Sequence, residues 1–310
     1  MCSSDLFLMS KKIIDHQNVF DYRNKKNGKK KFGKDKPLPF VSGKSSYDSD
    51  NKKLSKNDDE NSRAENNLHK KKKEEQLYCG VHTCHAIFKQ RRSDIIKVYL
   101  VKELVKEFGE LLKFCSTKKI AYRIVDEQDL KKLTDSTHHE GIAVLTKFVK
   151  TKNLADLPAA APILWLDGVV NPHNIGIMMR IMAHFGWQHL VVNGTKTVIS
   201  PAAARMSEGG CEFVTLYGID SAKEFVLWAK KNGYKIVGTS SHSSLSVYEY
   251  SMCRKMIFVV GQEADGISKE VMRLLDESLI IPGTGNVESL NVSVACGIFL
   301  SEYTRQIGIK

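Results

Sequence analysis

Three short segments of this sequence hold amide, carboxylate and guanidinium side chains that could bind and orient a polar substrate. They are DGVVNPHNIGIMMR (167–180), FVVGQEADGIS (258–268) and IIPGTGNVESLNVSVACG (280–297). Each begins in or just after an apolar run typical of a buried strand, and the first and third continue into an apolar helical pattern. Polar groups at the start of a helix are suited to binding anions such as phosphate.

A repeated alternation of strands and helices must position these segments. The sequence predicts strands at 163–169, 189–194, 212–218, 234–240, 256–261 and 278–283, and helices at 174–185, 202–208, 221–232, 268–276 and 291–306. Apolar strands that alternate with helices predict a parallel sheet covered on both faces. Ligands bind at the carboxyl ends of such strands, so we expect the three polar segments to meet at one edge of the sheet.

Each polar residue also has an ordinary structural role open to it. Asn171 before Pro172 is typical of a turn, and Asn174 of a helix cap. Arg180 lies on a predicted helix, where most arginines are exposed or ion-paired. We favour a shared site because one site at one sheet edge accounts for all three segments together.

A smaller unit precedes the alternation. Helices are predicted at 78–91, 102–115 and 127–134, and strands at 95–101, 121–125 and 141–148. We therefore expect a small α/β domain at 77–149, a proline-punctuated linker at 150–162 and a larger domain at 163–310. Residues 1–76 are rich in Lys, Asn and Ser and sparse in apolar residues, which predicts a disordered tail. This tail is either a basic arm that binds a polyanion or a solvated extension.

The composition favours one class of partner. The formal net charge is +12 and the isoelectric point about 9.2, which favours nucleic acid over a membrane surface. No run reaches the roughly 18 apolar residues of a membrane span, and the N-terminal lysines follow the short apolar patch, contrary to a signal peptide. The seven cysteines form no CxxC pair, which predicts a reducing, cytoplasmic setting.

A metal site is not expected at the only local cluster of Cys and His. Cys79, His82, Cys84 and His85 fall within one predicted helix. At that spacing their side chains point in different directions and cannot converge on one tetrahedral centre.

The three polar segments resemble, in order, the three motifs of the SpoU (TrmH-like) family of RNA 2′-O-ribose methyltransferases. That family has N…NxGxxxR, then an apolar strand with GxExxG, then IP…G…SLNVSVA; this chain has NPHNIGIMMR, FVVGQEADG and IPGTGNVESLNVSVA. ARMSEGGCE (204–212) is similar to the small-residue segment between the first two, and the resemblance covers about 160–306. YCGVHTCHAI and HHEGIAV resemble, more weakly, the ends of the family's substrate-binding domain, which is related to a ribosomal-protein fold. The GTGN loop, the HHEG pair and the basic tail most resemble a branch known as uncharacterised tRNA/rRNA methyltransferases.

The resemblance implies a fold and a cofactor that the residue pattern alone does not predict. It implies a parallel-sheet α/β domain with a deep C-terminal trefoil knot (SPOUT-type), in a homodimer whose active site spans the interface. It also implies S-adenosyl-L-methionine bound by main-chain groups. Carried onto this chain, the cofactor-binding residues are Gly261, Ile281 and Leu290, with Thr239 near the pocket. The absence of a G-x-G-x-x-G loop agrees with a cofactor site of another kind.

The resemblance further implies catalytic residues, with Arg180 at the ribose hydroxyl. Similar enzymes are described as using this arginine as the base. Because a free guanidinium has a pKa above about 12, we favour its binding the phosphate and stabilising the developing alkoxide, while a phosphate oxygen or water takes the proton. We expect Asn174 to position Arg180 or the ribose, and Glu263 to orient Asn174 or the cofactor pocket. Ser289 and Asn291 would hold the substrate phosphate or the methionine end of the cofactor.

Three functions are weighed on this basis. The leading one is an S-adenosylmethionine-dependent methyltransferase acting on a ribose 2′-hydroxyl in tRNA or rRNA. The alternative is a catalytically silent SpoU-fold protein that binds RNA on ribosome or tRNA precursors, and the retained Arg180, Glu263 and Asn291 argue against it. An α/β enzyme for a small acidic metabolite explains neither the basic tail nor the small domain. His138 and His139 are expected to be loop residues that contact RNA or solvent rather than catalysts.

Overall fold

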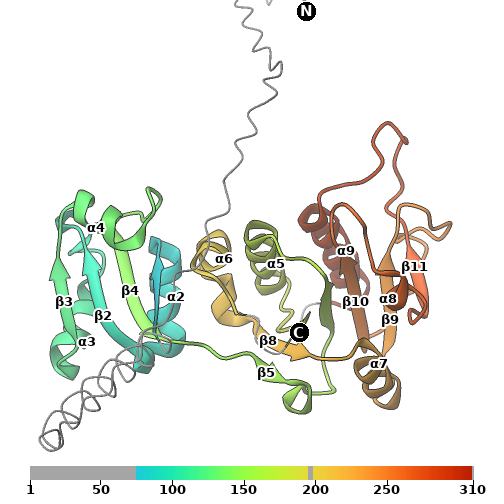
Figure 1. Cartoon of the computed structure of the whole chain (residues 1–310), viewed down its shortest axis with the longest axis horizontal. Coiled ribbons are helices and arrows are strands. Elements are labelled where there is room, and N and C mark those ends of the chain that lie inside the picture. Colours follow the sequence, from blue (N-terminus) through green and yellow to red (C-terminus); the bar gives the residue numbers. More distant parts are fainter. Residues whose placement is uncertain (1–74, 195–197, 309–310) are drawn as a thin grey trace, which may run out of the picture. The chain divides into compact units, whose positions relative to one another are not determined.

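The computed structural model describes residues 75–194 and 198–308, which contain two separate β-sheets (Figure 1). We refer to residues 75–147 as the four-stranded region and to residues 152–308 as the seven-stranded region. The predicted tail lies outside the described residues, except for Glu75 and Gln76, which begin the first strand. No described helix is long and apolar enough to cross a membrane.

The four-stranded region is a mixed sheet in the order β1-β4-β2-β3. Its strands are β1 (Glu75–Cys79), β2 (Ile95–Leu100), β3 (Ala121–Ile124) and β4 (Ile142–Lys147). Its helices are α2 (Val81–Arg91), α3 (Gly109–Lys118) and α4 (Glu127–Thr134), with short 3-10 turns η1 (Arg92–Asp94) and η2 (Lys102–Leu104). The β1 and β2 strands run antiparallel to β4, and β3 runs parallel to β2.

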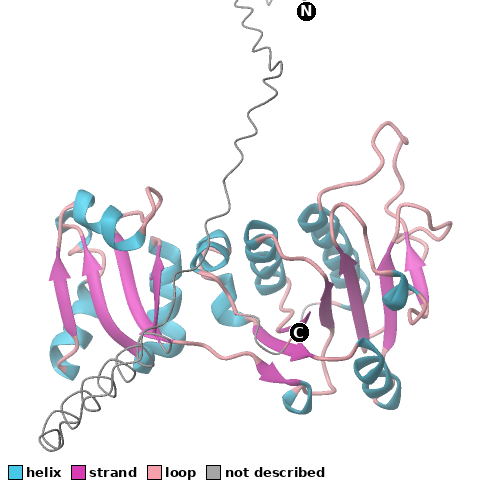
Figure 2. Cartoon of the chain, in the orientation of Figure 1, coloured by secondary structure: helices cyan, strands magenta, loops and turns pink. Residues whose placement is uncertain are grey.

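The seven-stranded region is an all-parallel sheet in the order β11-β9-β10-β6-β7-β8-β5 (Figure 2). Its strands are β5 (Lys152–Asn153), β6 (Ile163–Asp167), β7 (His189–Asn193), β8 (Thr215–Ile219), β9 (Lys235–Thr239), β10 (Met256–Gly261) and β11 (Glu277–Leu279). Its helices are α5 (Pro172–His184), α6 (Pro201–Met206), α7 (Ala222–Lys231), α8 (Lys269–Met272) and α9 (Val292–Ile307), with short 3-10 turns η3 (Leu154–Asp156) and η4 (Gly210–Phe213).

Both faces of the parallel sheet are covered, as the apolar strands predict. Along β6, Leu164 and Leu166 pack with methionines of α5 and with Phe299 of α9, whereas Ile163 and Trp165 pack with Phe225 of α7. Successive side chains of a strand point to opposite faces. Each strand residue is therefore buried although the side chains alternate in direction, which explains the continuous apolar runs.

Helix starts in the seven-stranded region follow capping rules. Asn171 accepts a hydrogen bond from His173 N at 3.0 Å and Pro172 occupies the first turn of α5; Ser200 and Pro201 do the same for α6. The α5 and α6 helices approach closely at Gly176, where an added Cβ would lie 2.3 Å from Ala203 O. Only glycine allows this contact, which accounts for the glycine in NxGxxxR.

The connection between β9 and β10 is held along the C-terminal segment. Ser246 forms a β-bridge with Ile280, and Val247 N donates to Ile280 O at 2.9 Å. Further along the chain, the Tyr303 hydroxyl donates to Arg254 O at 3.0 Å. The chain leaves β11 at the edge of the sheet and returns to α9, which packs on β10 and α5.

The structure corrects several of the predicted elements. Residues 78–79 were predicted to begin a helix but end strand β1, and Gly80, with a φ of 102°, separates that strand from α2. The helix predicted at 102–115 is divided into η2 and α3. The strand predicted at 212–218 starts only at Thr215, because the chain forms η4 first. The predicted linker supplies the edge strand β5.

Candidate active site

Three of the proposed site residues are joined in one hydrogen-bond network. Asn174 Nδ2 donates to Glu263 Oε1 at 2.6 Å, and Asn291 Nδ2 donates to the same oxygen at 2.8 Å. Asn291 Nδ2 also lies 3.2 Å from Asn174 Oδ1. Asn174 comes from the first turn of α5, Glu263 follows β10, and Asn291 precedes α9. The three polar segments therefore meet, as the strand order predicts.

Helix capping fixes one member of this network. Asn291 is the N-cap of α9, and its Oδ1 accepts from Ser293 N at 2.9 Å and from Ser293 Oγ at 2.5 Å. With its oxygen engaged by the helix, its amide nitrogen is directed at Glu263. A carboxylate is an acceptor only, so Glu263 orients two amide donors at once. Asn174 is 5% exposed, which makes this pairing important, because an unpaired amide buried there would be costly.

Arg180 lies apart from this network in hydrogen bonding. Its Nη1 pairs with Glu208 Oε1 at 2.7 Å, and both side chains are about half exposed. Glu208 has a φ of 46°, a left-handed conformation that is uncommon for a residue other than glycine. At Gly210 an added Cβ would lie 2.8 Å from the Cα of Arg180. The segment after α6 therefore touches Arg180 at both its guanidinium and its backbone.

Three of the four residues expected at the cofactor lie at or just after the carboxyl ends of three neighbouring strands, and the fourth, Leu290, lies in the loop before α9. Thr239 ends β9, Gly261 ends β10, and Ile281 follows β11. A Cβ at Gly261 would lie 2.0 Å from Gly266 C, so the chain there folds back tightly, closed by reciprocal Gln262–Gly266 hydrogen bonds. Main-chain groups and apolar side chains at this edge fit the adenosine part of S-adenosylmethionine, which needs an apolar surface with a few polar contacts.

The segment between β11 and α9 is open to solvent. Residues 282–291 are all exposed, Ser289 among them, and Figure 1 shows them as a long loop beyond the carboxyl ends of the strands. Leu290 is 45% exposed and Val287 71%. Val170 and Val294, which belong to the segments that carry Asn174 and Asn291, are also exposed. The segments that carry the network therefore hold four exposed aliphatic side chains.

Two acidic residues beside the site were not predicted from the sequence. Glu208 lies in the small-residue segment 204–212, which has no pattern that predicts a site. The packing of α6 on α5 brings it beside Arg180. Asp167, at the end of β6, is 4% exposed; its oxygens accept from Asn193 Nδ2 at 3.1 Å and Ser268 N at 2.7 Å. The sequence signal for Asp167 was a carboxylate at the end of an apolar strand.

The remaining candidates are structural or lie elsewhere. Burial raises the pKa of the Cys211 and Cys296 thiols to about 12, so both stay protonated and serve as small core residues. His138 is exposed, whereas His139 is 7% exposed, so it is more buried than expected. Across residues 75–194 and 198–308, no three His, Cys, Asp or Glu side chains are grouped to hold a metal ion.

Two family models match the chain. Residues 161–301 match the SpoU rRNA methylase family, and residues 77–151 match the RNA 2′-O ribose methyltransferase substrate-binding family. Among curated proteins, the chain is 34% identical over 246 residues to the uncharacterised tRNA/rRNA methyltransferase YfiF of Escherichia coli, covering 77% of this chain and 70% of that protein. It is 29% identical to the 23S rRNA (guanosine-2′-O-)-methyltransferase RlmB of Nitrosomonas europaea, covering 74% of this chain and 92% of the relative.

Solved structures share the fold. A crystal structure of an RNA 2′-O ribose methyltransferase matches with a TM-score of 0.66 at 23% identity, covering 77% of this chain and 91% of that one. The SpoU methyltransferase AviRb from Streptomyces viridochromogenes, solved with AdoMet, matches with a TM-score of 0.64 at 21% identity, covering 76% and 92%. The motifs and the relatives agree: the chain belongs to the SpoU family of S-adenosylmethionine-dependent RNA 2′-O-ribose methyltransferases.

Proposed function

We propose that this protein transfers a methyl group from S-adenosylmethionine to a ribose 2′-hydroxyl of rRNA or tRNA. The observation that carries the proposal is the network in which Asn174, Glu263 and Asn291 join three motif segments at one sheet edge. The relatives support the reaction, since their names specify 2′-O-methylation of 23S rRNA or describe tRNA/rRNA methyltransferases. A silent RNA-binding protein would have no need to keep this network intact.

In this mechanism the chain aligns the ribose and manages its proton. When bound, S-adenosylmethionine supplies an electrophilic methyl group. Alignment of a 2′-oxygen with that group can lower the barrier by about 7–11 kcal/mol. Arg180 binds the substrate phosphate and stabilises the oxyanion that forms, and the proton leaves to a phosphate oxygen or water. Glu208 holds the guanidinium of Arg180 through Nη1, and the exposure of both side chains leaves room for a phosphate to bind beside them.

The proposed cofactor site uses Thr239, Gly261, Ile281 and Leu290. Three of them are at the carboxyl ends of the adjacent strands β9, β10 and β11, and Leu290 directly precedes Asn291. Glu263 and Asn291 fix the loops on both sides of this site. Ser289 lies in the exposed loop, and we propose that it contacts the methionine end of the cofactor or the substrate phosphate near the start of α9.

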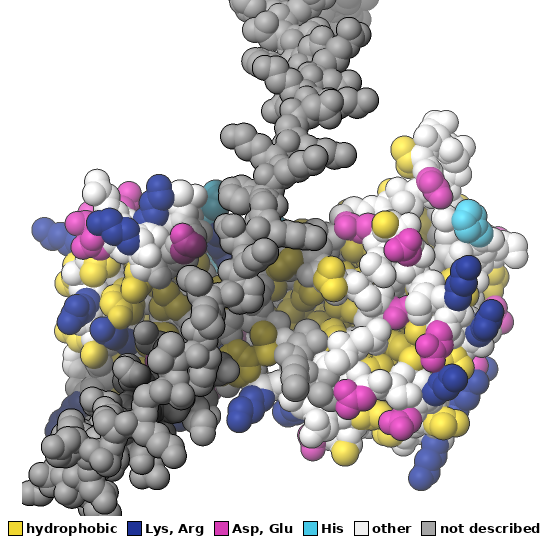
Figure 3. Space-filling view, in the orientation of Figure 1, with side chains coloured by type: hydrophobic (Ala, Val, Ile, Leu, Met, Phe, Trp, Pro, Cys, Tyr) yellow, Lys and Arg dark blue, Asp and Glu magenta, His cyan; other side chains and the backbone are white. Residues whose placement is uncertain are grey.

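RNA binding is assigned to the N-terminal half of the chain. Residues 151–310 carry 14 Lys and Arg and 14 Asp and Glu, so the whole net charge of +12 resides in residues 1–150. Figure 3 shows several Lys and Arg side chains on the visible face of the four-stranded region, among acidic and hydrophobic ones. We therefore propose that residues 77–149 bind the substrate, that residues 150–162 connect them to the catalytic residues 163–310, and that the basic side chains of residues 1–76 add to RNA affinity.

The family fold also leads us to propose a trefoil knot in the C-terminal segment. The supporting contacts are those that hold the β9–β10 connection on one side to Ile280 and on the other to Tyr303. Between these two contacts the chain passes from the edge strand β11 back to α9, which packs on β10. A chain that crosses such a held connection is arranged as a knot requires.

We also propose a homodimer in the cytoplasm. Val170, Val287, Leu290 and Val294 are 81%, 71%, 45% and 52% exposed, and all four lie in the segments that carry the network. A second copy would cover these side chains and complete the active site from the other side. The seven scattered cysteines, of which the described ones are unpaired, suit a reducing compartment.

Transfer of labelled methyl groups from S-adenosylmethionine to total bacterial RNA tests the reaction. We expect label at one nucleotide of rRNA or tRNA. The chain should resist alkaline hydrolysis at that nucleotide, as it does at a 2′-O-methylated ribose. Label on bases alone, or in no RNA class, would refute the proposal. The Arg180→Ala variant is the negative control.

A further inference from the structure

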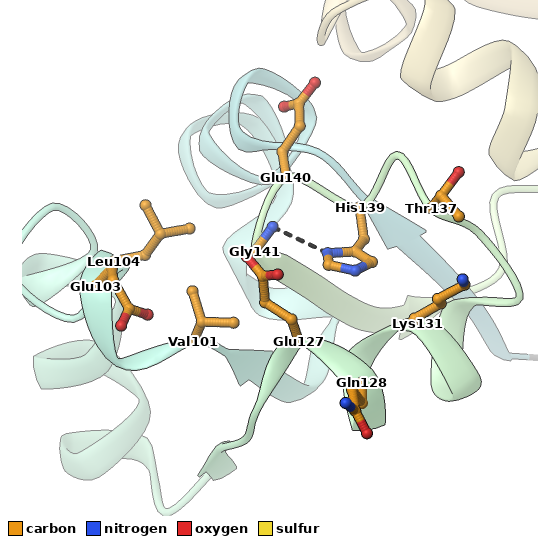
Figure 4. Close-up of a pocket in the computed structure, with 10 residues that line it drawn as sticks. All are labelled: Val101, Glu103, Leu104, Glu127, Gln128, Lys131, Thr137, His139, Glu140 and Gly141. Atoms are coloured by element: carbon orange, nitrogen blue, oxygen red, sulfur yellow. Dashed lines mark hydrogen bonds between the residues drawn. The ribbon is translucent and has the colours of Figure 1, made fainter.

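The four-stranded region contains a pocket that the methyl-transfer site does not use. Its volume is about 490 Å³, which is within the range of small-molecule pockets. Three elements line it: the end of β2 with η2, the helix α4, and the loop from α4 to β4 (Figure 4). Its lining residues are Val101, Glu103, Leu104, Glu127, Gln128, Lys131, Thr137, His139, Glu140 and Gly141.

His139 gives this pocket a buried imidazole ring in which one of the two nitrogens has no hydrogen-bond partner among the described residues. The side chain is 7% exposed, and its Nδ1 accepts a hydrogen bond from Gly141 N at 3.1 Å. A neutral imidazole that accepts at Nδ1 carries its proton on Nε2. No hydrogen bond joins Nε2 to any described residue, and it is not among the fully enclosed unpaired atoms. The Nε2–H group is thus a donor that remains for a ligand.

The loop that carries His139 is fixed in place before any ligand arrives. Val101 N donates to Gly141 O at 2.9 Å, and an added Cβ at Gly141 would lie 2.8 Å from Val101 Cγ2. Gly141 also has a φ of 79°, so this position requires glycine. On the other side of the loop, Arg205 of α6 donates to Ser136 Oγ at 2.9 Å. A site held this firmly loses little entropy on binding.

The charges around the pocket select against phosphate. Glu103 and Glu127 line it, with Lys131 as the only cation of the lining. Glu140 does not face the ligand, because its Oε2 accepts a hydrogen bond from Val81 N at 2.8 Å and Figure 4 shows its side chain directed away from the pocket. Carboxylates accept hydrogen bonds and repel anions, so the ligand presents hydrogen-bond donors and no negative charge at this point. Val101 and Leu104 offer an apolar wall for a flat ring.

We propose that this pocket binds an unpaired guanine base of the RNA substrate. The Watson–Crick edge of guanine carries two neighbouring donors, N1–H and the 2-amino group, next to the O6 acceptor. Glu127 would accept from the two donors, and His139 Nε2–H would donate to O6. Protein recognition of RNA commonly takes a base out of a loop or bulge in this way. The inference deepens the proposed function, since it depends on RNA being the substrate.

Binding of short RNA hairpins to the full-length protein tests this assignment. The hairpins share one sequence and differ only in a single bulged nucleotide: G, A, C, U or inosine, which lacks the 2-amino group. Fluorescence anisotropy in about 0.15 M salt limits non-specific binding by the basic residues. We expect the G bulge to bind on the order of tenfold more tightly than A, C or U, and inosine to be intermediate.

Variants separate the pocket from general RNA affinity. Glu127→Gln changes an exposed side chain and removes the carboxylate, so the preference for G over the other bulges should disappear. His139→Gln should weaken the preference as well. Glu110→Gln, which alters an exposed carboxylate on α3 outside the pocket, should leave the preference unchanged. Equal binding of all five hairpins by the wild-type protein would overturn the assignment, as would a G preference that survives Glu127→Gln.

The proposed methyl transfer can be tested separately with the same proteins. If total RNA is methylated but no bulge is preferred, the pocket assignment is wrong and the enzymatic function stands. If a G bulge is preferred and no RNA is methylated, the pocket assignment holds and the enzymatic function fails.

Discussion

Asn174 and Glu263 are 89 positions apart in the sequence, yet Asn174 Nδ2 donates to Glu263 Oε1 at 2.6 Å. The bond connects the first turn of α5, which follows β6, to the loop after β10. Strands β6 and β10 are direct neighbours in the sheet. Asn291 joins the same oxygen from the start of α9. One carboxylate thus sets the relative position of all three motif segments.

Removing that carboxylate should damage the site more than the fold. In Glu263→Ala, the buried amide of Asn174 loses its acceptor, at a cost of about 1–3 kcal/mol. We expect methyl transfer to fall by roughly tenfold to a hundredfold, with weaker cofactor binding measured by calorimetry. Asp265→Ala, in the same loop and exposed, is the control and should retain activity. Full activity of Glu263→Ala would show that the network has no role in catalysis.

The ion pair between Arg180 and Glu208 should matter for turnover and little for stability. Both side chains are about half exposed, so losing the pair costs at most about 1 kcal/mol of folding free energy. Glu208→Ala should lower kcat several-fold, because the guanidinium is no longer held. Glu249→Ala, another exposed carboxylate of the seven-stranded region, should be neutral. An unchanged kcat in Glu208→Ala would contradict a positioning role.

The ion pair of Arg91 and Glu212 should, by contrast, be important for stability. Arg91 Nε and Nη2 donate to the two carboxylate oxygens at 2.7 and 2.9 Å, and the side chains are only 13% and 7% exposed. Arg91→Ala leaves a shielded carboxylate unpaired, which costs about 3 kcal/mol or more. Urea unfolding measures this loss, and Arg123→Ala on the exposed strand β3 is the control. A loss below about 1 kcal/mol would show that solvent screens the pair.

His189 should make the protein less stable in mild acid. Burial, with a smaller contribution from Lys152, lowers the pKa of His189 below its usual 6.5. As the pH falls through 6.5, the unfolded chain binds a proton that the folded protein does not, so the free energy of unfolding decreases. Between pH 7.5 and 5.5 the melting temperature should fall less in His189→Gln than in the wild type or in His173→Gln. Parallel curves for all three would contradict this assignment.

The regular part of the fold could be predicted because each strand and helix leaves a local pattern. Strands such as 256–261 are apolar throughout, and that prediction matches β10 residue for residue. The errors arose where conformation depends on a single backbone position or on a distant partner. Gly80 ends β1 before the helical pattern begins, and β5 is a strand only because Lys152 and Asn153 pair with β8.

The candidate site was predictable as a set of segments but not as a set of contacts. Asn174, Glu263 and Asn291 follow from strand order and motif spacing, and they do meet. The pairing of Arg180 with Glu208 depends on how closely α6 packs against Gly176, which no periodicity reports. The donor at His139 likewise depends on one hydrogen bond from Gly141.

Methyl transfer by wild-type protein and Arg180→Ala, measured side by side, tests the central claim most directly. Labelled S-adenosylmethionine and unmodified rRNA and tRNA are the substrates, and cofactor affinity is measured on both proteins. We predict 2′-O-methylation at one ribose by the wild type, a loss of at least about a hundredfold in Arg180→Ala, and nearly equal cofactor affinities. Undiminished transfer by Arg180→Ala would contradict the account.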